Sequence, residues 1–362
     1  MLKLIHTADL HLDSPFSGLS PEKAAQRREE QRQLLSALAE LARTRKADAL
    51  LLSGDLLDGT STYRETIRAL STHLGAAGCP VFIAPGNHDP FHAASPYATL
   101  DWPEHVHIFS TAQVESVELP GKNCVIHGAA FPEKHLERSP LEGFCAPKDG
   151  KLHVMALHGE VDGPESYGPI SRETIAKSGL NYLALGHIHQ YSGIQKEGNT
   201  FWAYPGCPEG RGFDELGEKG VLYLELDETG CRGEFIPLSN HRYQILSVDL
   251  TGQEDHAAAI RAALPGDTAS DIYRILLTGQ TDNQPDASAL EQALSPLFYA
   301  LTIRDHTTLS RQLWARMDED TLTGLFLREM ALRCQQDPDN QTLQLAVRFG
   351  LAALEGGEDV SL

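Results

Sequence analysis

The chain has 362 residues, of which 41% are hydrophobic and 22% charged, and its formal net charge is −20. This is the composition of an ordinary globular protein of about two domains, and no apolar run approaches the roughly 20 residues that a membrane-spanning helix needs. The acidity argues against strong nonspecific binding of nucleic acid by this chain alone.

The cysteines and the first residues bear on the cellular compartment. Six cysteines are scattered along the chain without a C-x-x-C pair, which argues against a disulfide framework and against a structural zinc site. The chain begins with the strand-like sequence LKLIH, and no export or transit signal is visible. We therefore expect a cytoplasmic setting.

Residues 1–240 alternate short apolar runs with polar turns and helical stretches. A helix is predicted over 21–46, with Leu34, Leu38, Leu41 and Ala42 on its apolar stripe. Five runs are apolar on both faces, as in strands buried between layers: 2–6, 48–53, 80–84, 153–157 and 182–186. Strand-like segments with Gly and Asn turns indicate a second sheet: 192–195, 200–204, 220–226 and 233–238. The predicted fold class is α/β, a four-layer α/β/β/α sandwich over residues 1–240.

The pattern changes near Asn240. Residues 241–307 alternate strand and helix and predict a small α/β domain separate from the first. Two helical stretches follow in a C-terminal segment, residues 308–362, joined by the turn-like sequence DPDN.

Each of the five buried strands is followed by a polar cluster: HTADLHLD, SGDLLD, PGNHD, LHGE and GHIH. Ligand sites of open α/β sheets lie outside the carboxyl ends of the strands, so these clusters should meet at one edge of the fold. The pooled side chains are Asp9, His11, Asp55, Asn87, His88, His158, His187 and His189.

This pool has the chemistry of a metal centre. Imidazole, carboxylate and amide ligands together suit Mn, Fe or Zn, and one ion usually takes three or four protein ligands, so two metals are predicted. Asp55 is the natural bridge because a carboxylate has two oxygens to share. Asp9 and His11 share one side of an extended segment and would hold one ion with Asp55 and one histidine of GHIH.

Each motif alone has a simpler explanation. Asp9 and His11 could be a solvated strand end, Asp55 could cap a helix, and GNHD could be a turn. The joint occurrence of all five motifs favours the metal centre. The other eleven histidines are expected to be surface or core residues.

The motifs DLH, GDLLD, GNHD, the lone histidine of LHGE, and GHIH resemble those of the calcineurin-like metallophosphoesterases, over residues 4 to about 190. Within that superfamily, HTADLHLDSPF, VDG and AYPGCPEGRGFDELGEKG are similar to the bacterial SbcD and YhaO-type DNA repair exonucleases, relatives of the eukaryotic double-strand-break repair nuclease. The YhaO branch is the more similar of the two.

The resemblance implies a ligand set and a reaction. One metal would be held by Asp9, His11, Asp55 and His189, and the other by Asp55, Asn87, His158 and His187. The working ion would be Mn, with Fe, Mg or Zn as alternatives, and a metal-bound water would be the nucleophile. His88 would protonate the leaving oxygen or stabilise the transition state, and Asp89 is expected to orient its imidazole.

The resemblance also implies partners. DNA would be the substrate, the small domain would cap the active site, and a coiled-coil, SMC-like ATPase would bind the C-terminal helices. Leu322, Leu325, Phe326 and Met330 form an apolar stripe there, for which ordinary packing is the simpler explanation. A homodimer would use helices over 62–77 and 93–100. Archaeal and eukaryotic members carry a histidine where this chain has Asp58, whose role stays open.

Two other functions compete with the DNA exonuclease. One is a phosphatase or small-molecule phosphodiesterase on the same scaffold. The other is a non-catalytic interaction module that has lost its metals, against which the intact ligand set argues.

Overall fold

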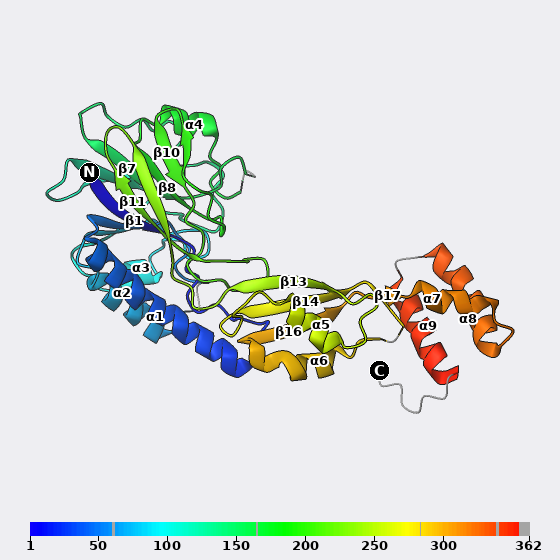
Figure 1. The fold of residues 1–362 in the computed structure, drawn as a ribbon. Coiled ribbons are helices and arrows are strands. Elements are labelled where there is room, and N and C mark those ends of the chain that lie inside the picture. The colour runs from blue at the N-terminus through cyan, green and yellow to red at the C-terminus, as the bar shows by residue number, and fades with distance from the viewer. Residues whose placement is uncertain (60–61, 164–165, 283, 338–339, 355–362) are drawn as a thin grey trace. The chain divides into compact units, whose positions relative to one another are not determined.

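The computed structural model describes residues 1–59, 62–163, 166–282, 284–337 and 340–354. The chain divides into two compact units, Met1–Arg242 and Tyr243–Leu362, here called unit 1 and unit 2 (Figure 1). Residues 355–362 of the predicted C-terminal segment lie outside the described residues.

The first sheet of unit 1 has six strands in the order β12-β11-β1-β2-β3-β4. They are β1 (Leu2–Thr7), β2 (Ala49–Leu52), β3 (Val81–Ile83), β4 (Val106–Ile108), β11 (Gly220–Leu226) and β12 (Cys231–Pro237). Strands β1 to β4 are parallel, whereas β11 pairs antiparallel with β1 and places Leu224 opposite Leu4. The carboxyl ends of β1, β2 and β3 therefore meet at one edge of this sheet.

The second sheet of unit 1 also has six strands, in the order β5-β6-β7-β8-β10-β9. They are β5 (Glu115–Glu118), β6 (Cys124–Gly128), β7 (Leu152–His158), β8 (Tyr182–Gly186), β9 (Gln195–Glu197) and β10 (Thr200–Ala203). The four inner strands are parallel, and the two edge strands pair antiparallel with them.

The prediction that all strand-like segments after residue 190 form one second sheet is wrong in part. Strands β9 and β10 join β7 and β8, but β11 and β12 complete the first sheet beside β1. Leu222 and Leu224 of β11 contribute to the core between the sheets, while Val221 and Tyr223 contribute to the core under the helices. A strand sequence that is apolar on both faces indicates that the strand is buried. It does not indicate to which sheet the strand belongs.

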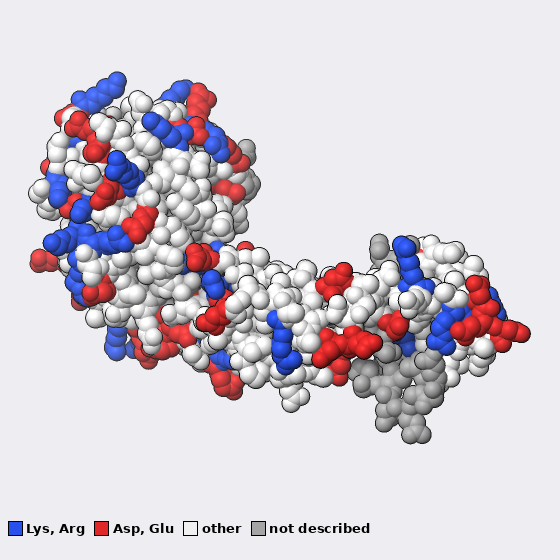
Figure 2. Space-filling view, in the orientation of Figure 1, with Lys and Arg blue, Asp and Glu red and all other residues white. Residues whose placement is uncertain are grey.

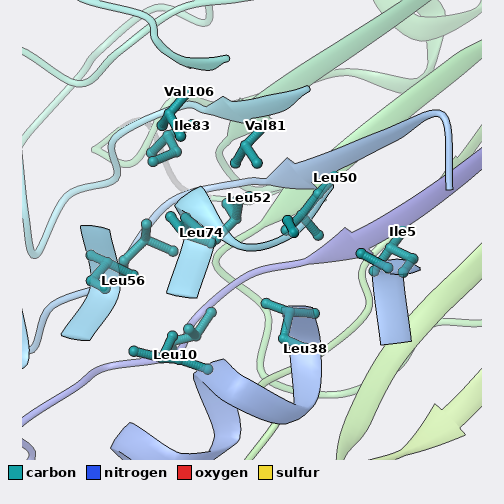
Figure 3. Close-up of a cluster of buried hydrophobic side chains, with 14 of the residues drawn as sticks. Ile5, Leu10, Leu38, Leu50, Leu52, Leu56, Leu74, Val81, Ile83 and Val106 are labelled. Atoms are coloured by element: carbon teal, nitrogen blue, oxygen red, sulfur yellow. The ribbon is translucent and has the colours of Figure 1, made fainter. Parts of the chain in front are cut away.

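Alternation along the strands builds the layers. Leu50 and Leu52 of β2 belong to the core with Leu38 and Leu74 of the helices, whereas Leu51 belongs to the core between the sheets (Figure 3). The helices of unit 1 are α1 (Pro21–Arg45), α2 (Arg64–Gly75), α3 (Pro96–Thr99) and α4 (Arg172–Lys177). A third core lies between the second sheet and its outer cover, which includes α4. The predicted four layers are confirmed.

Helix α1 matches the predicted range closely. It begins after Ser20, whose side chain accepts a hydrogen bond from the backbone of Lys23, and it ends at Lys46 in the left-handed conformation. Leu34, Leu38 and Ala42 are buried as predicted, but Leu41 is only partly buried. Of the two other predicted helices of this unit, 62–77 appears as α2, whereas 93–100 is reduced to the four residues of α3.

Unit 2 begins with the predicted small α/β arrangement. Its elements are β13 (Tyr243–Asp249), α5 (His256–Ala263), β14 (Ile272–Thr278), β15 (Gln280–Thr281), α6 (Ala287–Leu294), η1 (Ser295–Leu297) and β16 (Ala300–Asp305). Strands β13, β14 and β16 form a parallel sheet whose alternate residues pack on α5 and α6. The short strand β17 (Thr308–Leu309) pairs with β15.

The first C-terminal helical stretch is interrupted. It consists of α7 (Arg311–Ala315), η2 (Arg316–Asp318) and α8 (Leu322–Gln336), and α9 (Gln341–Leu354) follows. The break lies before Thr321, whose extended backbone and side-chain hydrogen bond to the Gly324 amide start α8 anew. The interpretation of the apolar stripe as packing is wrong for Leu322 and Leu325, which are 66% and 58% exposed.

Membrane-spanning helices and disulfide bonds were both predicted to be absent. None of the helices in the described part of the chain has the length and apolar character to cross a membrane. The six cysteines all fall among the described residues and are free thiols.

Candidate metal centre

The predicted site residues come from the ends of five strands in two sheets. Three clusters follow β1, β2 and β3 of the first sheet, and the other two end β7 and follow β8 of the second. The sheets approach so closely here that a Cβ on Gly186 would lie 1.9 Å from the carbonyl oxygen of Ser53. A Cβ on Gly54 would lie 2.4 Å from Nδ1 of His158. These two glycines allow the five clusters to merge into one site.

Several site residues adopt a strained backbone. Asp9, His11, Asp55 and His187 have positive φ angles of 55°, 42°, 53° and 110°. Such conformations cost about 1–3 kcal/mol each in residues with a Cβ and concentrate at functional sites. Backbone hydrogen bonds hold them, from Asp9 N to the Gly54 carbonyl and from His11 N to that of Asp55, each 3.0 Å long.

The structure brings the predicted ligands into two groups. The ligand atoms of Asp9, His11 and His189 lie within 4.8 Å of one another, and we call these three residues group A. The same limit holds for Asp55, His158 and His187, which with Asn87 we call group B. Asn87 belongs there because its Oδ1 lies 2.8 Å from His158 Nε2.

Asp55 lies between the two groups. Its Oδ2 is 3.3 Å from Nε2 of His158 in group B and 3.7 Å from Nε2 of His11 in group A. Asp9 ties the two sheets together, since its carboxylate accepts a hydrogen bond from the backbone N of His187. A carboxylate reached from both groups is the arrangement that a bridging ligand requires.

Outer hydrogen bonds decide which imidazole nitrogens face inward. Nδ1 of His11 lies 3.0 Å from Asp58, Nδ1 of His189 lies 2.7 Å from Glu215, and Nδ1 of His158 lies 2.9 Å from the Ser53 carbonyl. Carboxylates and carbonyls only accept, so a proton on each Nδ1 satisfies these three contacts; at His189 the Arg211 guanidinium also lies 3.1 Å from Nδ1. The Nε2 atoms, whose lone pairs can bind metals, point into the site.

The inward atoms fit divalent cations. Nε2 of His11 lies 3.2 Å from Nε2 of His189, so two acceptors face each other there. The donor set of two carboxylates, four imidazoles and one amide suits borderline ions such as Mn, Fe or Zn. The residues present therefore fit two metal ions, with group A and group B as their ligands and Asp55 shared.

The electrostatics of the site point the same way. Burial raises the pKa of Asp9 to about 6, and the nearby Asp55 carboxylate adds to this effect. Burial opposes the charged form of His158 as well, but Asp55 and Asp9 outweigh it and raise the pKa of His158 to about 9. Both shifts follow from negative charge that Asp9 and Asp55 concentrate in a buried site, and bound cations would neutralise that charge.

His88 lies outside both groups. Its side chain is exposed, its ring meets that of His11 edge-on with 4.8 Å between centroids, and its backbone N donates a 2.9 Å hydrogen bond to Asp55 Oδ1. A ligand atom of His88 also lies within 4.8 Å of ligand atoms of His11 and Asp58. The imidazole is therefore close to group A and accessible to a substrate.

The prediction that Asp89 orients His88 is wrong. The buried Asp89 carboxylate accepts hydrogen bonds from the backbone N atoms of Asp55, Leu56, Leu57 and Gly86 and from the Tyr97 hydroxyl. Burial and the Asp55 charge raise the pKa of Asp89 to about 7. Three of these donors belong to the loop after β2, so Asp89 holds that loop against the loop after β3, to which Asp89 itself belongs.

Apart from Asp58, the sequence did not identify the charged residues around the ligands. Asp58, Arg211, Glu215 and Lys219 contact His11 or His189, and Glu160 lies 3.6 Å from His187 Nε2. Three of them belong to the segment GRGFDELGEK, which was noted only for its resemblance. The many charged residues beside glycines in this segment were a signal that it is functional. Its contacts with His189 could not be predicted, because they join residues 22 to 30 positions apart.

Several known proteins are similar to this chain. The family described as calcineurin-like phosphoesterase matches residues 2–191. The metallophosphoesterase YhaO of Bacillus subtilis (strain 168) is 30% identical over 269 residues, which are 71% of this chain and 65% of that protein. The DNA double-strand break repair protein Mre11 of Aeropyrum pernix is 26% identical over 249 residues, 62% of this chain and 58% of that protein. The chain thus spans less than two thirds of either relative.

A solved structure is similar as well. The crystal structure of TT1561 of Thermus thermophilus has a TM-score of 0.41 and 14% identity, and the match covers 66% of this chain and 99% of that chain.

Proposed function

Because the chain belongs to the calcineurin-like phosphoesterase family, we propose that it is a two-metal, Mn-dependent exonuclease that hydrolyses phosphodiester bonds of DNA in repair. The observation that carries this proposal is the pair of ligand groups sharing Asp55. Paired sites of this kind suit the displacement of an oxygen at phosphorus. The similarity to a DNA double-strand break repair protein favours DNA as the substrate.

Group A, group B and the shared Asp55 would hold the two ions. When bound, the ions supply the positive charge that activates water and stabilises the phosphoryl oxygens. The protein fixes the imidazole tautomers through Asp58, Glu215 and the Ser53 carbonyl. His88, exposed beside group A, would donate a proton to the leaving oxygen.

A nuclease assay on the wild type and on His88→Ala tests the proposal. Wild-type protein is expected to degrade linear DNA with Mn and to lose the activity with chelator. His88→Ala should lose about 10²–10⁴-fold in turnover, the usual contribution of general acid catalysis, and keep its metal content. Wild-type protein that hydrolyses a chromogenic phosphomonoester but no DNA would make it a phosphatase instead.

DNA binding is expected to need a partner. The net charge is −20, and Figure 2 shows Asp and Glu interspersed with Lys and Arg on the visible face of both units. We propose the coiled-coil, SMC-like ATPase as this partner, bound at the exposed Leu322, Leu325 and Leu332 of α8. The double variant Leu322→Glu/Leu325→Glu should no longer co-elute with the ATPase. The control Leu297→Glu, which changes another exposed leucine of the same unit, should still co-elute.

A homodimer through α2 is a further proposal. Partly exposed residues of this helix surround the buried Thr66, Leu70 and Leu74. Sedimentation of the purified chain at two concentrations tests it, and a monomer at both would reject the dimer.

A further inference from the structure

Three charged side chains form a connected chain behind group A. Asp58 accepts from His11 Nδ1 at 3.0 Å, and Glu215 accepts from His189 Nδ1 at 2.7 Å. Arg211 joins these two carboxylates, donating from Nη1 to Asp58 at 3.1 Å and from Nη2 to Glu215 at 2.7 Å. We call Asp58, Arg211 and Glu215 the outer triad.

The outer triad reaches both histidines of group A from the side away from the metal-facing atoms. A carboxylate that accepts from Nδ1 fixes the tautomer, holds the ring and makes Nε2 a stronger ligand. Nε2 of His11 and Nε2 of His189 are the atoms that lie 3.2 Å apart. Two neighbouring ligands of one ion are thus oriented by the two ends of one charged unit.

Arg211 offsets the negative charges of the two outer carboxylates, Asp58 and Glu215. Glu215 is only 3% exposed, and burial by itself would favour its neutral form. Arg211 supplies a positive charge that compensates for this burial, since its guanidinium donates to both Glu215 and Asp58. The two carboxylates are therefore paired with the same cation.

The segment that carries Arg211 and Glu215 is anchored independently. Glu209 is buried and paired with the buried Arg27 of α1, and it also accepts from the backbone N of Asn240. Lys219 Nζ donates to the His189 carbonyl oxygen at 2.9 Å. Contacts with α1 and with the backbone thus hold in place the segment that carries Arg211 and Glu215.

Group B is held differently. Nδ1 of His158 donates to the Ser53 carbonyl, which is a neutral backbone acceptor. The Glu160 carboxylate lies 3.6 Å from Nε2 of His187, beyond a good hydrogen bond. The charged outer support is therefore concentrated on group A.

We propose that Asp58, Arg211 and Glu215 act as one positioning unit that sets the affinity of the group A ion and leaves the group B ion unaffected. This inference rests on the two-metal site of the proposed function, but it concerns ion binding and not the reaction. It also assigns a role to Asp58, which stands where archaeal and eukaryotic relatives carry a histidine.

Metal binding by four variants tests the proposal, with Mn as the probe. Titration calorimetry and metal analysis give the number and affinity of bound ions, and electron paramagnetic resonance distinguishes coupled Mn pairs from single Mn ions. Glu215→Ala should weaken one of two ions by about 10–100-fold, the usual cost of losing an outer-shell partner, and leave the other unchanged. Its spectrum should change from that of a coupled pair to that of a single ion.

Three further variants separate positioning from simple structural damage. Glu215→Gln keeps an oxygen for Nδ1 and should restore part of the lost affinity, and Asp58→Asn should also weaken one ion only. Glu218→Ala, at an exposed glutamate of the same segment, is the matched control and should bind two ions as the wild type does.

The readout distinguishes this inference from the proposed function. Wild-type protein that binds two Mn ions but cleaves no DNA would refute the exonuclease and leave the inference intact. Equal weakening of both ions in Glu215→Ala, unchanged binding in both Glu215→Gln and Asp58→Asn, or wild-type protein that binds fewer than two ions would overturn the inference.

Discussion

The two units of the chain use their residues in different ways. All eight non-glycine residues with positive φ among the described residues lie in unit 1, and four of them belong to the metal centre. Unit 1 also buries Asp9, Asp55 and His158 within one site, whereas the described residues of unit 2 bury Asp271 and Arg348 and contain no group of candidate metal ligands. Unit 2 in turn carries most of the exposed large apolar residues, among them Leu322 and Leu325.

This difference has a physical cause. Strained backbone and buried charge lower stability, so they persist only where surrounding contacts compensate for them. The two sheets and three cores of unit 1 supply those contacts. None of the described residues of unit 2 combines buried charge with a positive φ angle in this way, and several of its leucines are exposed.

The largest expected effect comes from Asp55→Asn in unit 1. The substitution keeps the shape of the side chain but removes the charge shared by groups A and B. Bound Mn should fall from two ions to at most one, and DNA turnover should fall by more than about 10³-fold, beyond the 10–100-fold cost of outer-shell changes. Metal analysis and the nuclease assay measure both. Retention of two tightly bound ions would show that Asp55 is not the bridge.

A cavity in unit 2 should act on that unit's stability without affecting metal binding. Leu327 is fully buried in the core that joins α8 and α9, so Leu327→Ala should lower the free energy of unfolding there by about 2–5 kcal/mol. Hydrogen exchange of the α8 amides measures the loss. Leu325→Ala, at an exposed leucine of the same helix, should change it by less than about 0.5 kcal/mol. Loss of bound Mn in Leu327→Ala would contradict the separation of roles.

The close approach of the two sheets can be broken with one methyl group. Gly186→Ala places a Cβ against the Ser53 carbonyl, which is backbone and cannot move alone. We expect a loss of about 1–3 kcal/mol in the free energy of unfolding, the usual cost of overpacking. Urea unfolding measures it. Gly18→Ala is the matched control, since a Cβ there meets nothing within 4 Å. Equal stability of the two variants would disprove the steric requirement.

A further expected effect concerns pH and a histidine away from the metal centre. Burial, with a contribution from His153, lowers the pKa of His127 from 6.5 to about 4. Between pH 6.5 and about 4, His127 is therefore protonated in the unfolded chain but not in the folded chain. The stability linked to this group is complete above pH 6.5 and falls by up to about 1.4 kcal/mol per pH unit as the pH drops toward 4.

The variant His127→Asn isolates this contribution. Urea unfolding at several pH values gives the free energy of unfolding of the wild type and of the variant. Below pH 6.5 the free energy of the wild type should fall steadily relative to that of the variant. A difference that does not change with pH would show that His127 is protonated equally in both states.

Much of the metal centre could be predicted from local sequence. Apolar runs followed by Asp9, Asp55, Asn87, His158 and His187 identified strands whose carboxyl ends carry ligands, and the structure brings these residues together. Such patterns are readable because each strand and the turn after it are set by neighbouring residues.

Other features were beyond the reach of local pattern. The sequence could not assign β11 to the sheet of β1, since its apolar residues suit either sheet equally. It suggested that Asp89 serves its neighbour His88, whereas Asp89 accepts from backbone atoms more than 30 residues away.

The sequence by itself therefore determined which candidate ligands lie at the ends of the strands, because ligand types at strand ends are a local property. Only the tertiary structure decided how those residues are held. Asp58 and Arg211 are 153 residues apart and are joined by packing between loops. Contacts of that kind depend on the whole fold, which brings distant charges close enough to pair.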